Sequence, residues 1–113
     1  MVNRAAVILK YKEPMVRWIN DSDPYNDDPG ITPASANKEN TVYLIRDRDA
    51  ENLQKWLSRN FKMLFENELE AWYIDESLWP RKLTRKMFNE WFDVECHSVL
   101  LDTVGGAILD DEI

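Results

Sequence analysis

The sequence predicts a single α+β domain covering residues 1–113, folded as a two-layer sandwich in which helices cover one face of a mixed sheet of three or four strands. Three observations lead to this prediction. The chain has 113 residues, which is the usual size of one domain. Short segments rich in β-branched residues alternate with segments whose apolar residues recur every three or four positions. Apolar residues make up 44% of the chain, enough to fill one core.

The expected order of elements is β-α-β-α-α-β-β. Residues 5–12, AAVILKYK, form the first predicted strand, because they are short, partly β-branched and closed by a Glu-Pro pair. Pro14 favours the first turn of a helix over residues 14–20, which turns three apolar side chains to one side, namely Met15, Trp18 and Ile19. Residues 41–46, TVYLIR, form the second strand, because β-branched and aromatic residues dominate them.

Residues 21–40 predict a long surface loop, since prolines, aspartates and a glycine are typical of turns, although Thr32 can cap one helical turn. The stretch INDSDPYNDDPG at its start raises the question of a cation site. An EF-hand register fails, because counting from Asp21 puts Tyr25 at a ligand position. Aspartate beside proline also builds turns, so we interpret the stretch as structural. A weak, open divalent-cation site that includes Asp27 and Asp28 is the alternative.

The strongest pattern in the chain predicts a helix within residues 49–73, begun by Asp47 or Asp49 as its N-cap. Apolar residues recur along it at spacings of three and four, at Leu53, Trp56, Leu57, Phe61, Leu64, Phe65, Leu69 and Trp72. We expect this stripe to pack on the sheet. Pro80 breaks the helical pattern, and Thr84 caps a further helix that turns four side chains inward, at Met87, Phe88, Trp91 and Phe92.

Residues 93–104 form the longest predicted strand, because polar and apolar residues alternate in DVECHSVLLDTV. Gly105-Gly106 then suits a two-residue hairpin turn, leading to a short last strand over residues 107–109. The stretches ENELEAWYIDESLWP and WFDVECHS resemble small bacterial proteins of unknown function, over the second half of the chain. The resemblance implies no activity for any residue.

The charge of the chain limits its partners. A net charge of −7 and a pI near 4.7 disfavour nucleic acid and suit a basic protein partner. The single cysteine, Cys96, allows neither an intrachain disulfide nor a thiolate zinc cluster and fits a cytoplasmic protein. The longest early apolar run is too short to span a membrane. We expect no metal and no cofactor, and we expect the acidic residues of 66–76 to pair with the basic residues of 81–86.

The sequence ECH marks the candidate site. On a strand, Glu95 and His97 point one way and Val94 and Cys96 the other, toward the helix-covered core. Alternation along the other strands places further side chains on the uncovered face, so that the predicted binding residues are Lys10, Lys12, Tyr43, Glu95 and His97.

Three hypotheses of function follow. The first is a non-enzymatic protein-binding module or regulator that uses this face. The second is a small enzyme with His97 and Glu95 as acid and base, in a pocket near residues 21–30. The third is a structural homodimer that joins two uncovered sheet faces.

Overall fold

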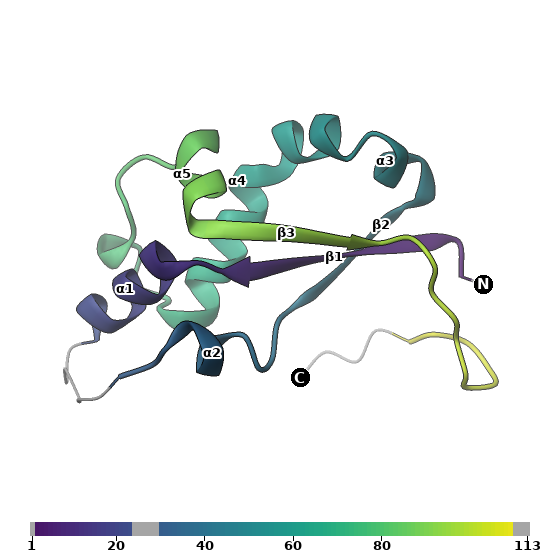
Figure 1. The fold of residues 1–113 in the computed structure, drawn as a ribbon, viewed down its shortest axis with the longest axis horizontal. Coiled ribbons are helices and arrows are strands. Elements are labelled where there is room, and N and C mark those ends of the chain that lie inside the picture. Colours follow the sequence, from purple (N-terminus) through teal and green to yellow (C-terminus); the bar gives the residue numbers. More distant parts are fainter. Residues whose placement is uncertain (1, 24–29, 110–113) are drawn as a thin grey trace.

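The computed structural model describes residues 2–23 and 30–109, and it confirms the α+β class. One sheet contains β1 (Arg4–Tyr11), β2 (Val42–Arg46) and β3 (Phe92–His97) in the order β2-β1-β3. Both outer strands run antiparallel to β1, so the expectation of a mixed sheet was wrong. The sequence carries no signal for strand direction here, because every connection between strands contains helices and such connections suit either direction. In Figure 1, α3, α5 and much of α4 lie above the strands, and α1 and α2 lie near one end.

Helices account for most of the remaining chain, as α1 (Glu13–Ser22), α2 (Pro33–Ala36), α3 (Asp47–Glu51), α4 (Leu53–Trp72) and α5 (Arg85–Trp91), with a 3₁₀ turn over Glu76–Leu78. The predicted caps at Thr32 and Thr84 are confirmed, since each side chain accepts a hydrogen bond from the backbone N–H of the third residue in its helix. The predicted aspartate cap on the long helix was wrong. Asp47 and Asp49 belong to the separate helix α3, and α4 begins after Asn52.

The core lies between α4 and the sheet, as the apolar stripe predicted. Leu57, Leu64, Phe65 and Leu69 are buried on α4 and face the buried side of β1. Phe65 is the centre of an aromatic cluster, because its ring lies 5.2 to 6.2 Å from three others, those of Phe88, Trp91 and Phe92. Packing of this stripe against the sheet explains why a twenty-residue helix forms here.

Phe61 lies at the margin of this core, half-buried, with its ring 6.2 Å from that of Phe88. We expect Phe61→Ala to lower the free energy of unfolding by about 2 kcal/mol, near half the usual cost of removing a fully buried phenylalanine. Urea unfolding followed by circular dichroism measures this loss. Phe61→Leu, which keeps most of the apolar volume, should cost less than about 1.5 kcal/mol. Equal losses in the two variants would contradict this account of the contact.

The last part of the chain departs from the prediction. Strand β3 ends at His97, and residues 98–109 form neither helix nor strand, so the strand over 107–109 is absent. The Gly105-Gly106 pair does not make the predicted turn, because only Gly106 has a positive φ. One backbone bond, from Val2 N–H to the Leu100 carbonyl at 2.9 Å, holds the start of this tail. The tail then exposes Val99, Leu101, Val104, Ile108 and Leu109.

Two asparagines complete the edge of β1 beyond the end of β2. The Asn37 side chain accepts from Tyr11 N–H at 2.8 Å and donates to the Tyr11 carbonyl at 3.0 Å. Asn40 donates to the Leu9 carbonyl at 3.2 Å. These amides replace a strand partner, so the chain before β2 is held on the sheet although residues 37–41 are not a strand. The predicted cation site or turn around Asp27 and Asp28 lies outside the described residues.

Candidate functional site

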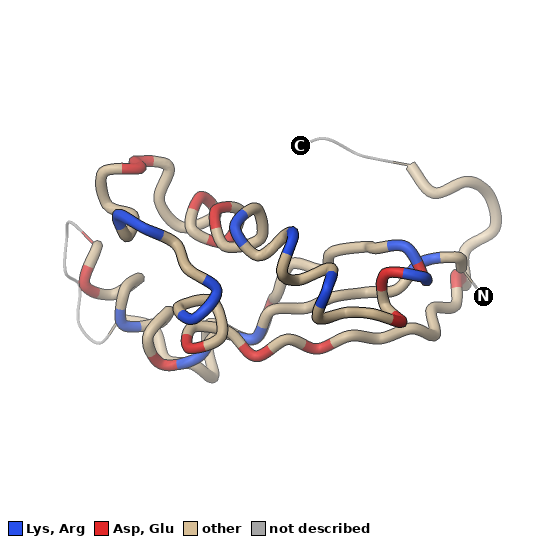
Figure 2. Tube along the Cα trace, turned by 90° about the horizontal axis from the view of Figure 1, so that it is seen from above, with Lys and Arg blue, Asp and Glu red and all other residues tan. Residues whose placement is uncertain are grey.

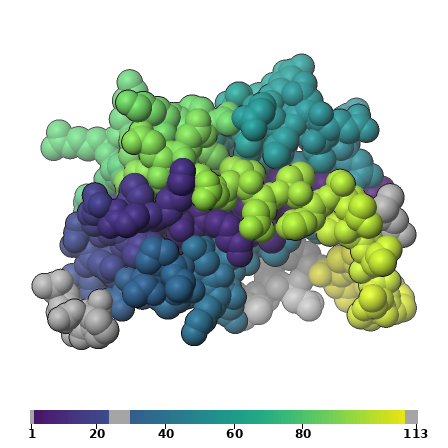
Figure 3. Space-filling model, in the orientation of Figure 1, coloured from purple at the N-terminus to yellow at the C-terminus, as the bar shows by residue number. Residues whose placement is uncertain are grey.

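The sheet has one face against the helices and one open face. As predicted, Val94 and Cys96 of β3 pack against the core, whereas Glu95 and His97 point away from it. Burial raises the pKa of the Cys96 thiol, in keeping with a structural side chain. We define the open sheet face by the outward residues of the three strands, which are Arg4, Ala6, Ile8, Lys10, Val42, Leu44, Arg46, Asp93, Glu95 and His97. Figure 3 shows β1 and β3 reaching the molecular surface in this region.

The placement of Tyr43 on the open sheet face was wrong. Tyr43 pairs with Val7, whose side chain is fully buried, so Tyr43 points toward the helices. The residues that β2 presents outward are Val42 and Leu44, which are 54% and 55% exposed. Strand β2 is apolar on both faces, so alternation along it could not fix its register.

The other predicted binding residues share the open sheet face or its end. Lys10 donates to the Asn40 side chain at 3.0 Å, and the Lys12 ammonium lies 3.6 Å from the Asp93 carboxylate. The His97 Nε2 and Glu95 Oε2 atoms are 3.5 Å apart, which is longer than a hydrogen bond. This pair is about half exposed, and neither residue lines the two surface hollows described below.

The two edge strands of the sheet, β2 and β3, differ in how well they are protected against pairing with a further strand. The outward side chains of β3 are Asp93, Glu95 and His97, and charges of this kind discourage a further strand from pairing. Strand β2 presents Val42 and Leu44, has a charged residue, Arg46, only at its last position, contains no proline, and has no strand on its outer side among the described residues. An edge of this composition is a template for another strand.

A buried carboxylate lies between the sheet and α4, and the sequence analysis missed it. Glu68 is 3% exposed and accepts hydrogen bonds from two tyrosine hydroxyls, that of Tyr11 at 2.7 Å and that of Tyr43 at short range. Trp72 donates to the Tyr11 hydroxyl at 2.9 Å, and Asn67 donates to the Tyr43 hydroxyl at 2.8 Å. Every buried polar side-chain atom of the cluster therefore has a partner, as a buried carboxylate requires.

The cluster changes the chemistry of both tyrosines. Burial is the main reason that the pKa of Tyr11 lies above its usual value near 10, and the adjacent Glu68 carboxylate raises it further. The pKa of Tyr43 is raised for the same two reasons. Both hydroxyls are thus held protonated as donors. The sequence did indicate that Glu68 is buried, because it falls on the same helical stripe as Leu64, Phe65 and Leu69.

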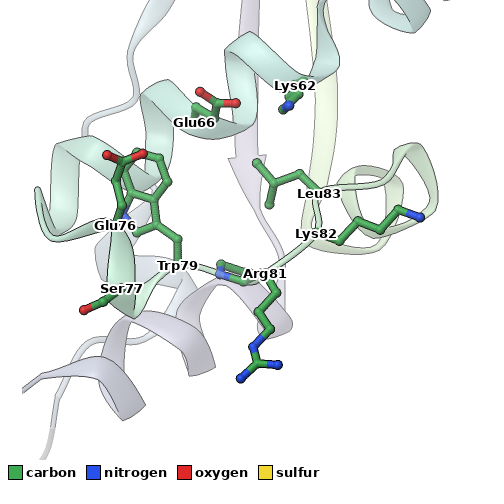
Figure 4. Close-up of a pocket in the computed structure, with 9 residues that line it drawn as sticks. Lys62, Glu66, Glu76, Ser77, Trp79, Arg81, Lys82 and Leu83 are labelled. Atoms are coloured by element: carbon green, nitrogen blue, oxygen red, sulfur yellow. The ribbon is translucent and has the colours of Figure 1, made fainter.

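Two surface hollows beside α4 are lined mainly by polar residues. One of about 630 Å³ lies between α4 and residues 76–83, and one of about 420 Å³ lies where α3 meets α4. Figure 4 shows the first, with Lys62 and Glu66 on α4 above Leu83, and with Arg81 and Lys82 pointing away from each other. Its cations do not converge on one point, so it is not built for a single small anion.

Comparison with protein-family models, curated protein sequences and solved structures finds no match for this chain. The resemblance to small bacterial proteins stays a prediction. Among residues 2–23 and 30–109, no helix combines the length and the apolar character needed to cross a bilayer. The same residues contain no group of three His, Cys, Asp or Glu side chains that could hold a metal ion.

Proposed function

We propose that this chain is a non-enzymatic protein-binding module that takes an extended segment of another protein alongside β2, adding a strand to the sheet. The observation that carries the proposal is the unprotected edge of β2, where Val42 and Leu44 are exposed at alternate positions. An added strand pairs through its backbone and sets alternate side chains on the open sheet face. The expected partner segment is therefore extended and carries aliphatic residues at every second position.

The open sheet face supports this choice of partner. Ala6 and Ile8 of β1 lie beside Leu44 and Val42 in register, so four aliphatic side chains form its centre. Arg4 and Arg46 are direct cross-strand partners at one end of the face, and neither forms an ion pair among the described residues. Like charges placed opposite each other destabilise a sheet, so an acidic residue in the partner segment would relieve them.

A second copy of this chain is a special case of the same partner, because β2 could pair with β2 of another molecule and continue the sheet. The acid-base hypothesis for His97 and Glu95 has less support, since the pair lies on a half-exposed surface with no hydrogen bond between its members.

The test uses a synthetic peptide with the sequence of residues 40–47, titrated into the full chain by isothermal calorimetry. Residues 42–46 of this peptide form a strand in the chain and carry aliphatic residues at alternate positions, Val42 and Leu44. We expect saturable binding, and we expect Leu44→Lys to weaken it at least about tenfold, because lysine on an edge strand opposes strand addition. Sedimentation of the unmodified chain at increasing concentration measures pairing between copies.

Ile74→Lys is the matched control, because Ile74 is 81% exposed and lies outside the sheet. Both lysine variants should keep the melting temperature of the parent, as exposed substitutions usually change stability by less than about 0.5 kcal/mol. The proposal is wrong if the peptide does not bind and the chain does not associate. It is also wrong if the two variants bind the peptide equally well.

A further inference from the structure

A row of basic side chains follows the exposed side of α4. Lys55, Arg59 and Lys62 are spaced by four and three residues, so they share one helix face about 10 Å long. Lys82 lines the same hollow as Lys62, and Arg85 reaches across from α5 to Ser58 and Gln54 at 3.1 and 2.9 Å. We call Lys55, Arg59, Lys62, Lys82 and Arg85 the basic strip. Figure 2 shows where Lys and Arg, and Asp and Glu, lie along the whole described chain.

The acidic residues expected to neutralise this region do not do so. Among the described residues, no member of the basic strip forms an ion pair with a carboxylate. The guanidinium of Arg85 is held instead by neutral groups, the side chains of Gln54, Ser58 and Asn89. The expected pairing of residues 66–76 with residues 81–86 was therefore wrong, and the basic strip keeps its charge available.

The fold does not explain why the charges are arranged in this order along α4. A helix is stabilised by acidic residues near its N-terminus and basic residues near its C-terminus. In α4 the order is reversed, with Lys55 and Arg59 in the first turns and Glu66 and Glu70 toward the end. The reversed arrangement opposes the helix dipole, so a role outside folding accounts for it better.

The net acidity of the chain does not act evenly on this strip. The chain has 21 acidic residues. Five of them belong to the segments outside the described residues, namely Asp27, Asp28, Asp110, Asp111 and Glu112. Sixteen acidic and fourteen basic residues are left in the described part. At physiological ionic strength, charges separated by more than about 8 Å are largely screened, so a ligand on the basic strip responds mainly to its own surroundings.

We infer that the basic strip binds a short acidic segment of a partner protein, at a surface separate from β2. The dimensions favour this ligand over nucleic acid. Asp49 lies beside one end of the strip and Glu66 beside the other. Three or four residues of an extended peptide span the length of about 10 Å from Lys55 to Lys62. A nucleic-acid duplex, with a negative charge about every 1.7 Å, would run over both acidic borders.

Two tryptophans provide apolar contacts beside the charges. Trp56 lines the hollow at the Lys55 end, together with Arg59, and Trp79 lines the hollow that contains Lys62. Both indoles are half-buried, so each has part of its surface free. An acidic segment that also carries leucine or an aromatic residue would use both kinds of contact.

The test is a calorimetric titration of the full chain with a synthetic peptide of about six residues, in which four glutamates are flanked by two leucines. We expect saturable binding that weakens as salt is added. Lys55→Glu/Arg59→Glu should weaken binding at least about tenfold and should keep or raise the melting temperature, because the new charges suit the helix dipole. If the strip served only to stabilise the fold, the double variant would instead have a lower melting temperature than the parent. That result would overturn the inference.

Lys38→Glu/Arg17→Glu is the matched control, since it makes the same change in net charge at two exposed positions outside the strip. Equal weakening in both double variants would assign the effect to overall charge and overturn the inference. A single-stranded oligonucleotide that carries the same charge as the peptide serves as a second ligand. If it binds as tightly as the peptide, the choice of an acidic protein segment as the partner is overturned. Leu44→Lys should leave binding of the acidic peptide unchanged, so the strip and the β2 edge are tested separately.

Discussion

Glu68→Ala is expected to lower the free energy of unfolding by about 3 to 5 kcal/mol. The alanine removes the acceptor of two tyrosine hydroxyls, and hydrogen bonds to a carboxylate contribute about 1.5 to 3 kcal/mol each. Tyr11 is buried, so its hydroxyl loses its acceptor away from water. Urea unfolding followed by circular dichroism gives the value.

Two further variants separate the polar contacts from the packing of this cluster. Glu68→Gln keeps the volume and one acceptor oxygen, so the loss should be smaller, about 1 to 2 kcal/mol. A triple variant, Glu68→Leu with Tyr11→Phe and Tyr43→Phe, removes the three connected polar groups together. It should recover much of the stability lost in Glu68→Ala, since no hydroxyl is then left without its carboxylate. A loss below about 1 kcal/mol in Glu68→Ala would contradict the stabilising role of the cluster.

Above pH 10 the protein is expected to lose stability steeply. The folded state holds Tyr11 and Tyr43 protonated, because burial and Glu68 raise the pKa of both above the value near 10 of an unfolded chain. Above pH 10 the unfolded chain releases these protons while the folded chain keeps them. The free energy of unfolding therefore falls as pH rises, by at most about 1.4 kcal/mol per pH unit for each hydroxyl. Partial exposure of Tyr43 reduces the expected slope for the pair to about 2 kcal/mol per unit.

Urea unfolding at a series of pH values between 8 and 12 measures this slope. Lysines and other groups also titrate in that range, so the informative quantity is the difference from a Tyr11→Phe/Tyr43→Phe variant. The variant should be less stable than the parent at neutral pH and should have a flatter dependence above pH 10. The same slope in both proteins would show that these two hydroxyls are not responsible.

The parts of this fold that the sequence predicted are those with a regular apolar pattern. The apolar stripe along α4 predicted which face of the helix is buried. The alternation in residues 93–97 correctly predicted that Glu95 and His97 point outward. In β2 both faces are apolar, so the register came only from its pairing with β1, and Tyr43 was misplaced. The apolar residues after His97 resemble a strand but meet no neighbouring strand, which local sequence cannot reveal.

The candidate surfaces were less predictable, because they depend on contacts between distant segments. The cluster at Glu68 joins residues 57 positions apart in sequence through the bond to Tyr11. The basic strip joins α4 to α5, and the expected ion pairs between neighbouring acidic and basic stretches do not form in the described part of the chain. Sequence distance was a poor guide in both cases, since folding sets which charges meet.

The five tryptophans are distributed so that different parts of the molecule carry different indoles. Trp56 and Trp79 line the two hollows beside the basic strip, and Trp72 is hydrogen-bonded to Tyr11 next to Glu68. Trp18 and Trp91 lie with their rings 6.3 Å apart where α1 meets α5. The intrinsic fluorescence of the chain is thus a sum of separable local signals. Variants of the chain that keep one tryptophan would each report on one region. Trp56 or Trp79 would report ligand contact at the basic strip, Trp72 the state of the Glu68 cluster, and Trp18 or Trp91 the packing of α1 against α5.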